Sequence, residues 1–177
     1  MFETRPFFQE YSTPGHHTYH TAIRQRAIHL FNHLRWHACI DMVKAALSGH
    51  KQTLMDLGDI PSDQIVSRHY QGLREVSIDS IRGSMGRCVD FDRHFRPLHD
   101  RMRDRWTSVA MARWQDVPLA AVQLIQVGDS YFVQDGHHRI SIARALGQIT
   151  IDAEVTTWDV DTAQASVQNL AYQAMPC

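Results

Sequence analysis

The chain has 177 residues, of which 44% are hydrophobic and 21% charged, a balance that excludes wholesale disorder and fits one globular domain, or one domain with an added helical layer. Eighteen Lys and Arg residues stand against nineteen Asp and Glu residues, so the formal net charge is -1 with neutral histidines. This charge does not support a nucleic-acid partner, because a protein that holds nucleic acid through a broad basic surface neutralises phosphates for most of its affinity.

The N-terminal part, residues 1–72, is expected to hold an irregular arm and a helical region. Residues 1 to about 20 are rich in aromatics, His and Pro and show no periodicity. Between Thr21 and Leu47 apolar residues recur near helical spacing, which predicts one long amphipathic helix, or two with a break. Gly49 is the expected stop, and a weaker helical pattern follows over residues 52–57.

The second part, residues 73–177, mixes strand-like and helical patterns. Residues 74–79 alternate like a strand with one buried face, and residues 81–87 are predicted to form a glycine-punctuated loop. Residues 98–114 carry apolar side chains three and four positions apart. This spacing predicts a helix with Pro97 in its first turn.

A hairpin and a short helix are predicted next. Residues 122–127 and 130–134 are strand-like on either side of a Gly-Asp turn. A short helix is expected to close at Gly147, and a last strand over residues 149–155 to precede a C-terminal helix from Asp159. The order predicts an α+β domain with a small mixed sheet and flanking helices, behind the N-terminal helical region.

The run Asp135-Gly136-His137-His138-Arg139 joins the hairpin to the short helix. The first amides of a helix lack intrahelical partners and its dipole favours an anion, while imidazoles and a guanidinium add donors. The pattern therefore predicts a phosphate-binding loop. The alternative is that Asp135 caps the helix and both histidines are solvated, and spacing alone leaves both interpretations open.

Residues 73–157 resemble the ParB/sulfiredoxin superfamily in the order strand, Asp-Gly-His-His-Arg, helix, Gly and strand. ParB-type domains carry Gly-Glu-Arg-Arg at this loop and contact CTP phosphates. Sulfiredoxins carry Gly-Cys-His-Arg and contact ATP phosphates, and a third branch includes ADP-dependent free-serine kinases. With Gly-Arg-x-x-Asp-Phe-Asp at residues 86–92, the chain is similar to small bacterial proteins named for a ParB-like nuclease domain.

The resemblance implies a ParB/sulfiredoxin-like fold and a bound nucleotide, CTP, ATP or ADP, with Mg²⁺ as a companion. The chain departs from the family at His137, which stands where sulfiredoxins keep their catalytic Cys, so sulfinic-acid repair by that chemistry is not expected. His137 and His138 replace Glu and Arg of the ParB run, so CTP cannot simply be carried over. The chain also ends soon after the domain, and we expect no DNA-sliding clamp.

Candidate site residues surround the same loop. For ligand binding they are Asp135, Gly136, His137, His138, Arg139, Ser141 and Arg87, and for catalysis His138, Asp90 and Asp92. Asp90 and Asp92 offer carboxylates to Mg²⁺ beside substrate phosphates, or a general base, with ordinary surface carboxylates as the alternative. No resident protein-only metal site is expected.

The predicted long helix carries His29, His33 and His37 along one face, which we interpret as a solvated or interface edge rather than a metal site. Trp36, Trp106 and Trp114 are expected to pack in the core or between layers. The wide apolar stripe makes this helix a candidate homodimer surface.

Three functions are consistent with these patterns. The first is binding of a nucleotide or another phosphorylated ligand, with phosphoryl transfer or hydrolysis as an open extension. The second is a metal-dependent nuclease or small-molecule kinase, and the third a non-catalytic dimeric regulatory or ligand-sensing module. Three separated cysteines, no apolar run that spans a bilayer and no signal peptide predict a cytoplasmic protein without a membrane partner.

Overall fold

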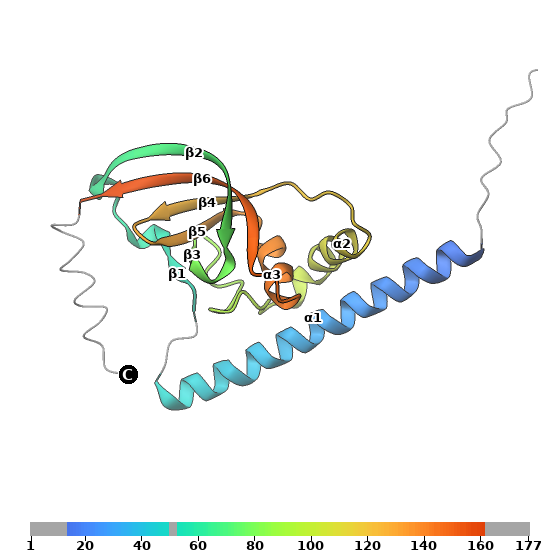
Figure 1. Cartoon of the computed structure of the whole chain (residues 1–177). Helices are drawn as coiled ribbons and strands as arrows, with labels where there is room; N and C mark the ends of the chain where they lie inside the picture. Colours follow the sequence, from blue (N-terminus) through green and yellow to red (C-terminus); the bar gives the residue numbers. More distant parts are fainter. Residues whose placement is uncertain (1–13, 50–52, 162–177) are drawn as a thin grey trace, which may run out of the picture.

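The computed structural model describes residues 14–49 and 53–161, which fold into a mixed sheet with flanking helices (Figure 1). In chain order the helices and strands are α1 (Pro14–Ser48), β1 (Met55–Asp56), β2 (Ile65–Ser77), β3 (Ile81–Ser84), α2 (Arg103–Trp114), β4 (Val122–Val127), β5 (Ser130–Asp135), α3 (His137–Ala145) and β6 (Thr150–Val160). The six strands lie in the order β1-β3-β5-β4-β6-β2. The β2–β6 and β4–β5 pairs are antiparallel, and the β1–β3, β3–β5 and β4–β6 pairs parallel. The predicted α+β class is confirmed.

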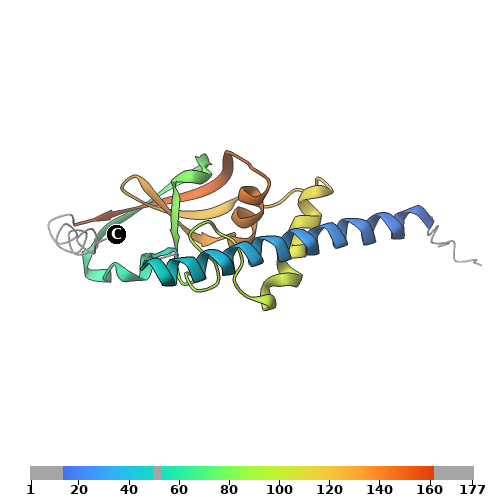
Figure 2. The same ribbon diagram turned by 90° about the horizontal axis from the view of Figure 1, so that it is seen from below.

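The core lies between the sheet and the helices. Phe31 of α1 meets Trp106 of α2 edge to face, with ring centroids 5.7 Å apart, and both side chains are fully buried. Ile140 and Ile142 of α3 belong to the same buried cluster. Figures 1 and 2 show α1 running past α2 and extending beyond the domain at its N-terminal end. At about 25 cal/mol per Å² of apolar surface, the two buried aromatics are major contributors to the free energy that joins α1 to the domain.

The long N-terminal helix is a single element. It begins at Pro14, so residues 14–20, which we expected in an irregular arm, are helical. Proline suits this place because its missing N–H belongs to a first turn that has no intrahelical acceptor. The helix ends at Ser48, and Gly49 follows with φ of 74°, as the sequence predicted.

Two predictions for the middle of the chain were wrong. Residues 55–59 form β1 and a 3-10 turn rather than the end of a helix, and residues 81–84 of the expected loop form β3. Gly83 lets these strands approach, since an added Cβ would lie 2.4 Å from the Met55 carbonyl oxygen. The expected boundary between residues 72 and 73 falls inside β2, which starts eight residues earlier than residue 73, at Ile65.

The remaining elements follow the predicted order with changed bounds. The helix expected from residue 98 begins as a 3-10 turn at Asp100 and becomes α2 at Arg103, so Pro97 lies outside its first turn. The hairpin and α3 are confirmed. Strand β6 continues through Val160, so the predicted start of a helix at Asp159 was wrong, and residues 162–177 of that helix lie outside the described residues.

Surface features also differ from expectation. Trp106 is buried and Trp114 half-buried, as predicted, but the Trp36 side chain is exposed on α1. Among the described residues, no helix has the length and apolar character needed to cross a bilayer.

Candidate functional site

A glycine turn joins β5 to α3. Strand β5 ends at Asp135, and Gly136 adopts φ of 98° and ψ of 19° before the first helical residue, His137. An added Cβ at Gly136 would lie 2.6 Å from Cγ1 of Val122 on β4. Both the left-handed backbone and the neighbouring strand therefore select glycine, and this sharp turn directs the start of α3.

The first turn of α3 has no side-chain cap. Gly136 carries no side chain that could accept from it, and its carbonyl receives the first helical hydrogen bond, from the Ile140 amide at 3.0 Å. The amides of residues 137–139 precede that bond and have no intrahelical acceptor. The positive end of the helix dipole therefore faces the turn. The alternative in which Asp135 caps the helix is wrong, because its carboxylate pairs with Arg139 instead.

Both histidines of the turn are buried, so the interpretation of solvated loop residues is wrong. The His137 ring stacks on Phe91 at 5.8 Å, and the His138 ring meets the same Phe91 edge to face at 5.6 Å. Nε2 of His137 lies 2.6 Å from Oγ of Ser84 on β3. Nδ1 of His138 is enclosed and has no hydrogen-bond partner within the described residues. Three other enclosed side-chain atoms of the described residues lack a partner, on Arg103, Thr107 and Arg144, and His138 is the one of the four that lies at this turn. Such atoms cost free energy unless a further group satisfies them.

Burial keeps both imidazoles neutral. Desolvation, with the positive charge of Arg87 as the next cause, lowers the pKa of His137 to about 4. Desolvation and the charges of Arg87 and Arg105 lower the pKa of His138 to about 4 as well. At neutral pH each ring is therefore a neutral donor and acceptor rather than a cation.

A cavity of about 250 Å³ opens at this turn. Its lining consists of Arg87, Arg105, Val109, Leu119, Ala120 and residues 135–139. Arg105 and Val109 lie one turn apart on α2 and so face the same side. Arg105 makes no hydrogen bond or ion pair within the part of the chain that the structure describes. The sequence analysis did not identify Arg105. Its spacing of four residues from Val109, within a predicted helix, places the two side chains on one face.

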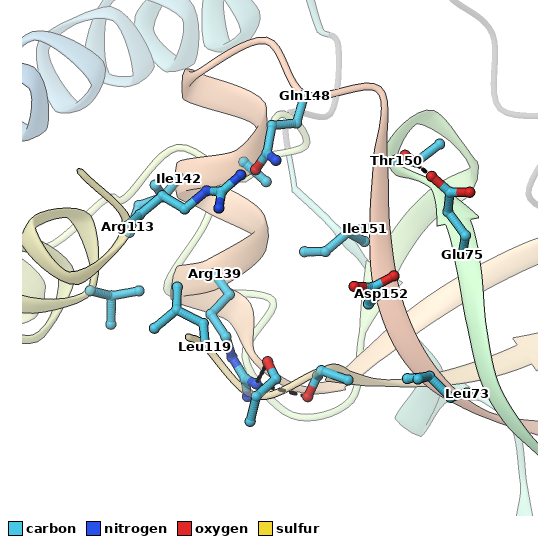
Figure 3. Close-up of a pocket in the computed structure, with 14 residues that line it drawn as sticks. Leu73, Glu75, Arg113, Leu119, Arg139, Ile142, Gln148, Thr150, Ile151 and Asp152 are labelled. Atoms are coloured by element: carbon cyan, nitrogen blue, oxygen red, sulfur yellow. Dashed lines mark hydrogen bonds between the residues drawn. The ribbon is translucent and has the colours of Figure 1, made fainter. Parts of the chain in front are cut away.

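The Arg139 guanidinium is bonded to protein acceptors rather than free for a phosphate. We expected its guanidinium to be a planar fork for phosphate, but Nη1 donates to the carbonyl oxygens of Ala120 and Ala121 at 2.5 and 2.7 Å. Nη2 pairs with the Asp135 carboxylate at 2.5 Å. Figure 3 shows this side chain reaching from α3 toward the segment that contains Leu119. Arg139 therefore anchors the segment before β4. It adds positive charge to the cavity wall, but both of its terminal nitrogens already donate to protein acceptors.

Arg87 and Asp90 meet beside the histidines. The Arg87 side chain, which lines the cavity, donates to the Asp90 carboxylate at 3.0 Å, and Arg101 reaches the other oxygen at 2.6 Å. Burial raises the pKa of the Asp90 carboxyl, but the hydrogen bonds and charges of Arg101 and Arg87 outweigh it and hold the pKa below its usual value. Asp90 is thus a buried anion that positions Arg87.

Asp92 holds its own loop together. The side chain is 1% exposed. One carboxylate oxygen accepts the amides of His94 and Arg96, and the other accepts the Arg96 side chain at 2.6 Å, which also reaches Asp41 of α1. Asp90 and Asp92 are both buried, so neither is the surface carboxylate of the alternative interpretation, and neither lines the cavity. Both oxygens of Asp92 are occupied by protein donors.

Ser141 also lies away from the cavity. It is buried, and its hydroxyl accepts the indole N–H of Trp106 at 2.9 Å. The expected ligand hydroxyl is instead a bridge between α2 and α3. It links α2, which carries Arg105, to α3, which carries the two histidines.

A second cavity of about 400 Å³ adjoins the first. The two share Val109, Leu119, Ala120 and Arg139 in their linings. Figure 3 shows Ile142 and Ile151 on its apolar side, with Asp152 and Glu75 on the sheet. Arg139 therefore stands between two hollows, one rich in positive charge and one partly apolar.

The described residues contain no cluster of three or more His, Cys, Asp or Glu side chains that could hold a metal ion. His33 and His37 make an edge-to-face ring contact on the exposed surface of α1, as expected for a solvated edge. Burial and the Asp56 carboxylate raise the pKa of the Cys88 thiol to about 11, so this thiol stays protonated at neutral pH.

Comparisons with known proteins find a single kind of likeness. No protein-family model matches the chain, and no curated protein matches it. The crystal structure of sulfiredoxin from Arabidopsis thaliana matches with 18% sequence identity and a TM-score of 0.34, over 55% of this chain and 93% of that chain. A likeness of this size says nothing about ligand or activity, and membership of the ParB/sulfiredoxin superfamily stays a prediction.

Proposed function

We propose that the cavity at the start of α3 binds the phosphate group of a nucleotide or another phosphorylated ligand. The observation that carries this proposal is the pair of buried, neutral histidines at an uncapped helix start: His137 and His138 line the cavity and are 3% and 6% exposed. The enclosed Nδ1 of His138 has no partner in the described residues, so the hydrogen bonding of this turn is incomplete. A ligand with several acceptor oxygens accepts from the amides of residues 137–139 and from the imidazole N–H groups that reach the cavity.

The charges around the cavity favour an anion. Arg87 and Arg139 are each opposed by a carboxylate, Asp90 and Asp135, whereas Arg105 has no acid partner within the described residues. Because both histidines are neutral, the uncompensated charge comes from Arg105 and the helix dipole. An anion in the cavity would neutralise that charge at short range, beside the buried histidines and the exposed Arg105.

The resemblance of the loop supports a nucleotide as the ligand class. It implies CTP, ATP or ADP, with Mg²⁺ bridging phosphates rather than resting in a protein-only site. In this proposal the backbone of residues 136–139, both imidazoles, Arg87 and Arg105 contact the phosphate, while Asp135 and Arg139 hold the loop.

Binding is favoured over catalysis because Asp90 and Asp92 are held by arginines. A kinase or nuclease reaction would need a base near the phosphate, and His138 is the remaining candidate among the three predicted catalytic residues. Its low pKa makes it a weak base, since proton transfer is most effective when the pKa of the base lies near the working pH.

Calorimetric titration with CTP, ATP, ADP and GTP, each with and without Mg²⁺, tests the proposal. We expect one of them to bind, and Arg105→Gln to weaken that binding about tenfold, the effect of losing roughly 1.4 kcal/mol of charged hydrogen bonding. Arg74→Gln, an exposed arginine on β2, is the charge-matched control and should leave affinity unchanged. No binding of any nucleotide by the folded protein, or equal loss in both variants, would remove the proposal.

A second proposal concerns self-association through α1. Trp36, Val43 and Leu47 are 66%, 62% and 85% exposed, and they recur at seven and four residues. This spacing places them on one stripe of the helix, opposite the buried Ala38 and Ala45, and it matches the seam of paired helices. We infer that a second copy of the chain packs its own stripe here.

Sedimentation equilibrium tests this dimer. The wild-type protein is expected to associate at micromolar concentration, and Val43→Glu to be monomeric, because a carboxylate in the seam would be desolvated without a partner. Met42→Glu, at a 44% exposed side chain one position before Val43 and therefore on a different face of α1, adds the same charge outside the stripe and should associate like the wild type. A monomeric wild-type protein would refute the proposed dimer and would leave the proposed anion site unaffected.

A further inference from the structure

The hydroxyl of Ser84 is enclosed between two partners. Ser84 lies at the end of β3 and is fully buried. Its Oγ accepts the main-chain amide of Arg87 at 3.2 Å and lies 2.6 Å from Nε2 of His137. Both partners contribute to the cavity at α3, so this buried serine connects the two loops that line it.

The bond between Ser84 Oγ and Nε2 of His137 has one consistent direction. The Arg87 amide is a donor, so Oγ accepts there and the serine proton must go elsewhere. Within the described residues the acceptor in reach of that proton is Nε2 of His137. If Nε2 carried a proton instead, the enclosed serine O–H would lack an acceptor, at a cost of about 1–3 kcal/mol. The serine therefore donates, and Nε2 of His137 is unprotonated.

The proton of a neutral imidazole then lies on Nδ1. Nδ1 of His137 makes no hydrogen bond to the described part of the protein, yet it is not among the enclosed atoms without a partner. This nitrogen is therefore accessible, and we infer that it opens to the cavity that His137 lines. His138 differs, since its own Nδ1 is enclosed.

We propose that Ser84 is a positioning residue that holds His137 in the Nδ1–H tautomer, so that the ring offers one fixed N–H donor to an unprotonated oxygen of the bound anion. This inference rests on the proposed anion site and narrows its ligand class. An oxygen that carries a proton still has lone pairs, but it is a weaker acceptor than an anionic oxygen. The site therefore favours phosphoryl or similar oxygens that carry no proton at this contact.

The stacking contact with Phe91 supports the same role. The two rings are 18° from parallel, which restricts rotation of the imidazole about its own axis. Together the ring of Phe91 and the hydroxyl of Ser84 define both the plane and the rotation of His137. A donor whose direction is fixed before binding loses little entropy when the ligand arrives.

Nitrogen-15 NMR of histidine-labelled, ligand-free wild-type protein at pH 7 tests the tautomer directly. The two ring nitrogens give distinct signals according to which one bears the proton, and we expect His137 to be protonated at Nδ1. Protonation at Nε2 would overturn the inference, whether or not an anion binds. This readout needs no variant and does not depend on ligand affinity.

Sulfate titration of Ser84→Ala then tests the link to binding, since sulfate carries no proton at pH 7. Loss of the hydroxyl should leave His137 as a mixture of tautomers and weaken sulfate binding about threefold to tenfold, with Ser84→Thr restoring both. Ser80→Ala, which removes an exposed hydroxyl bonded to the Ser77 carbonyl, is the control. An unchanged tautomer in folded Ser84→Ala would overturn the inference, whereas a correct tautomer with no anion binding to wild type would overturn the proposed function alone.

Discussion

Two neighbouring segments of the molecule contain buried polar groups, and they differ in how completely those groups are bonded. The loop over residues 86–96 contains Asp90 and Asp92, and the turn before α3 contains His137 and His138. All four side chains are buried, and sequence reasoning assigned catalytic or binding roles to each. Burial alone therefore does not separate structural from functional residues.

Hydrogen bonding separates them. In the loop both carboxylates meet arginines, and Asp92 also accepts two main-chain amides. In the turn His138 keeps an enclosed nitrogen without a partner, and the helix start has no cap. Buried polar groups with full hydrogen bonding hold the fold, and incompletely bonded ones beside a cavity are the better candidates for a ligand.

The largest expected effect lies in the loop. Asp92→Asn keeps the shape of the side chain but removes the charge that opposes Arg96, so a buried ion pair is broken. We expect the free energy of unfolding in urea to fall by about 3–5 kcal/mol. Asp129→Asn, in the exposed turn between β4 and β5, is the matched control and should change stability by less than about 0.5 kcal/mol. A loss below about 1 kcal/mol at Asp92 would break the distinction between the two segments.

The two histidines of the turn should make the stability of the protein depend on pH. The pKa of both histidines is about 4 in the folded protein and about 6.5 in the unfolded chain, so the unfolded state binds more protons between these values. Stability is fully present above pH 6.5 and is lost as the pH falls toward 4. The loss between pH 7 and pH 5 should be about 2 kcal/mol for each histidine.

Urea unfolding of variants across this pH range isolates the turn. His138→Gln should remove about half of the pH dependence because it removes one of the two titrating rings. His33→Gln, an exposed histidine on α1, should leave the dependence as it is. If His138→Gln also leaves it unchanged, burial of that imidazole does not control its charge, and the neutral-donor description of the site is wrong.

The elements that the sequence predicted are those marked by patterns among residues close together in the chain. The β4–β5 hairpin and the helix ending at Gly147 follow from alternation, helical spacing and glycine positions within about 25 consecutive residues. The glycine turn with its two histidines was found in the same way. These elements are adjacent in sequence, so the local residue pattern is enough to predict them.

The missed features depend on contacts between distant residues. Strand β1 has two residues and pairs with β3 in parallel, and no local alternation marks so short a strand. Arg139 reaches carbonyl oxygens at Ala120 and Ala121, and Arg96 joins α1 through Asp41. Which arginine is engaged and which, like Arg105, is not depends on tertiary packing that composition and spacing do not encode.

The smallest expected effect compares one glycine from each segment. Gly86 and Gly136 both have positive φ, of 80° and 98°, so alanine is strained at either position by about 1 kcal/mol. An added Cβ at Gly86 meets open space, whereas at Gly136 it would lie 2.6 Å from Val122. We therefore expect Gly136→Ala to cost about 1 kcal/mol more than Gly86→Ala in the free energy of unfolding.

A double-mutant cycle assigns that difference to its cause. Val122→Ala removes the Cγ1 methyl group at 2.6 Å but keeps the Cβ at 2.9 Å, so Gly136→Ala should cost less in the Val122→Ala background than in the wild type. The coupling free energy should be a part of the roughly 1 kcal/mol that separates the two glycines. Additive costs would mean that backbone conformation alone selects Gly136, and that β4 does not direct the start of α3 toward the cavity.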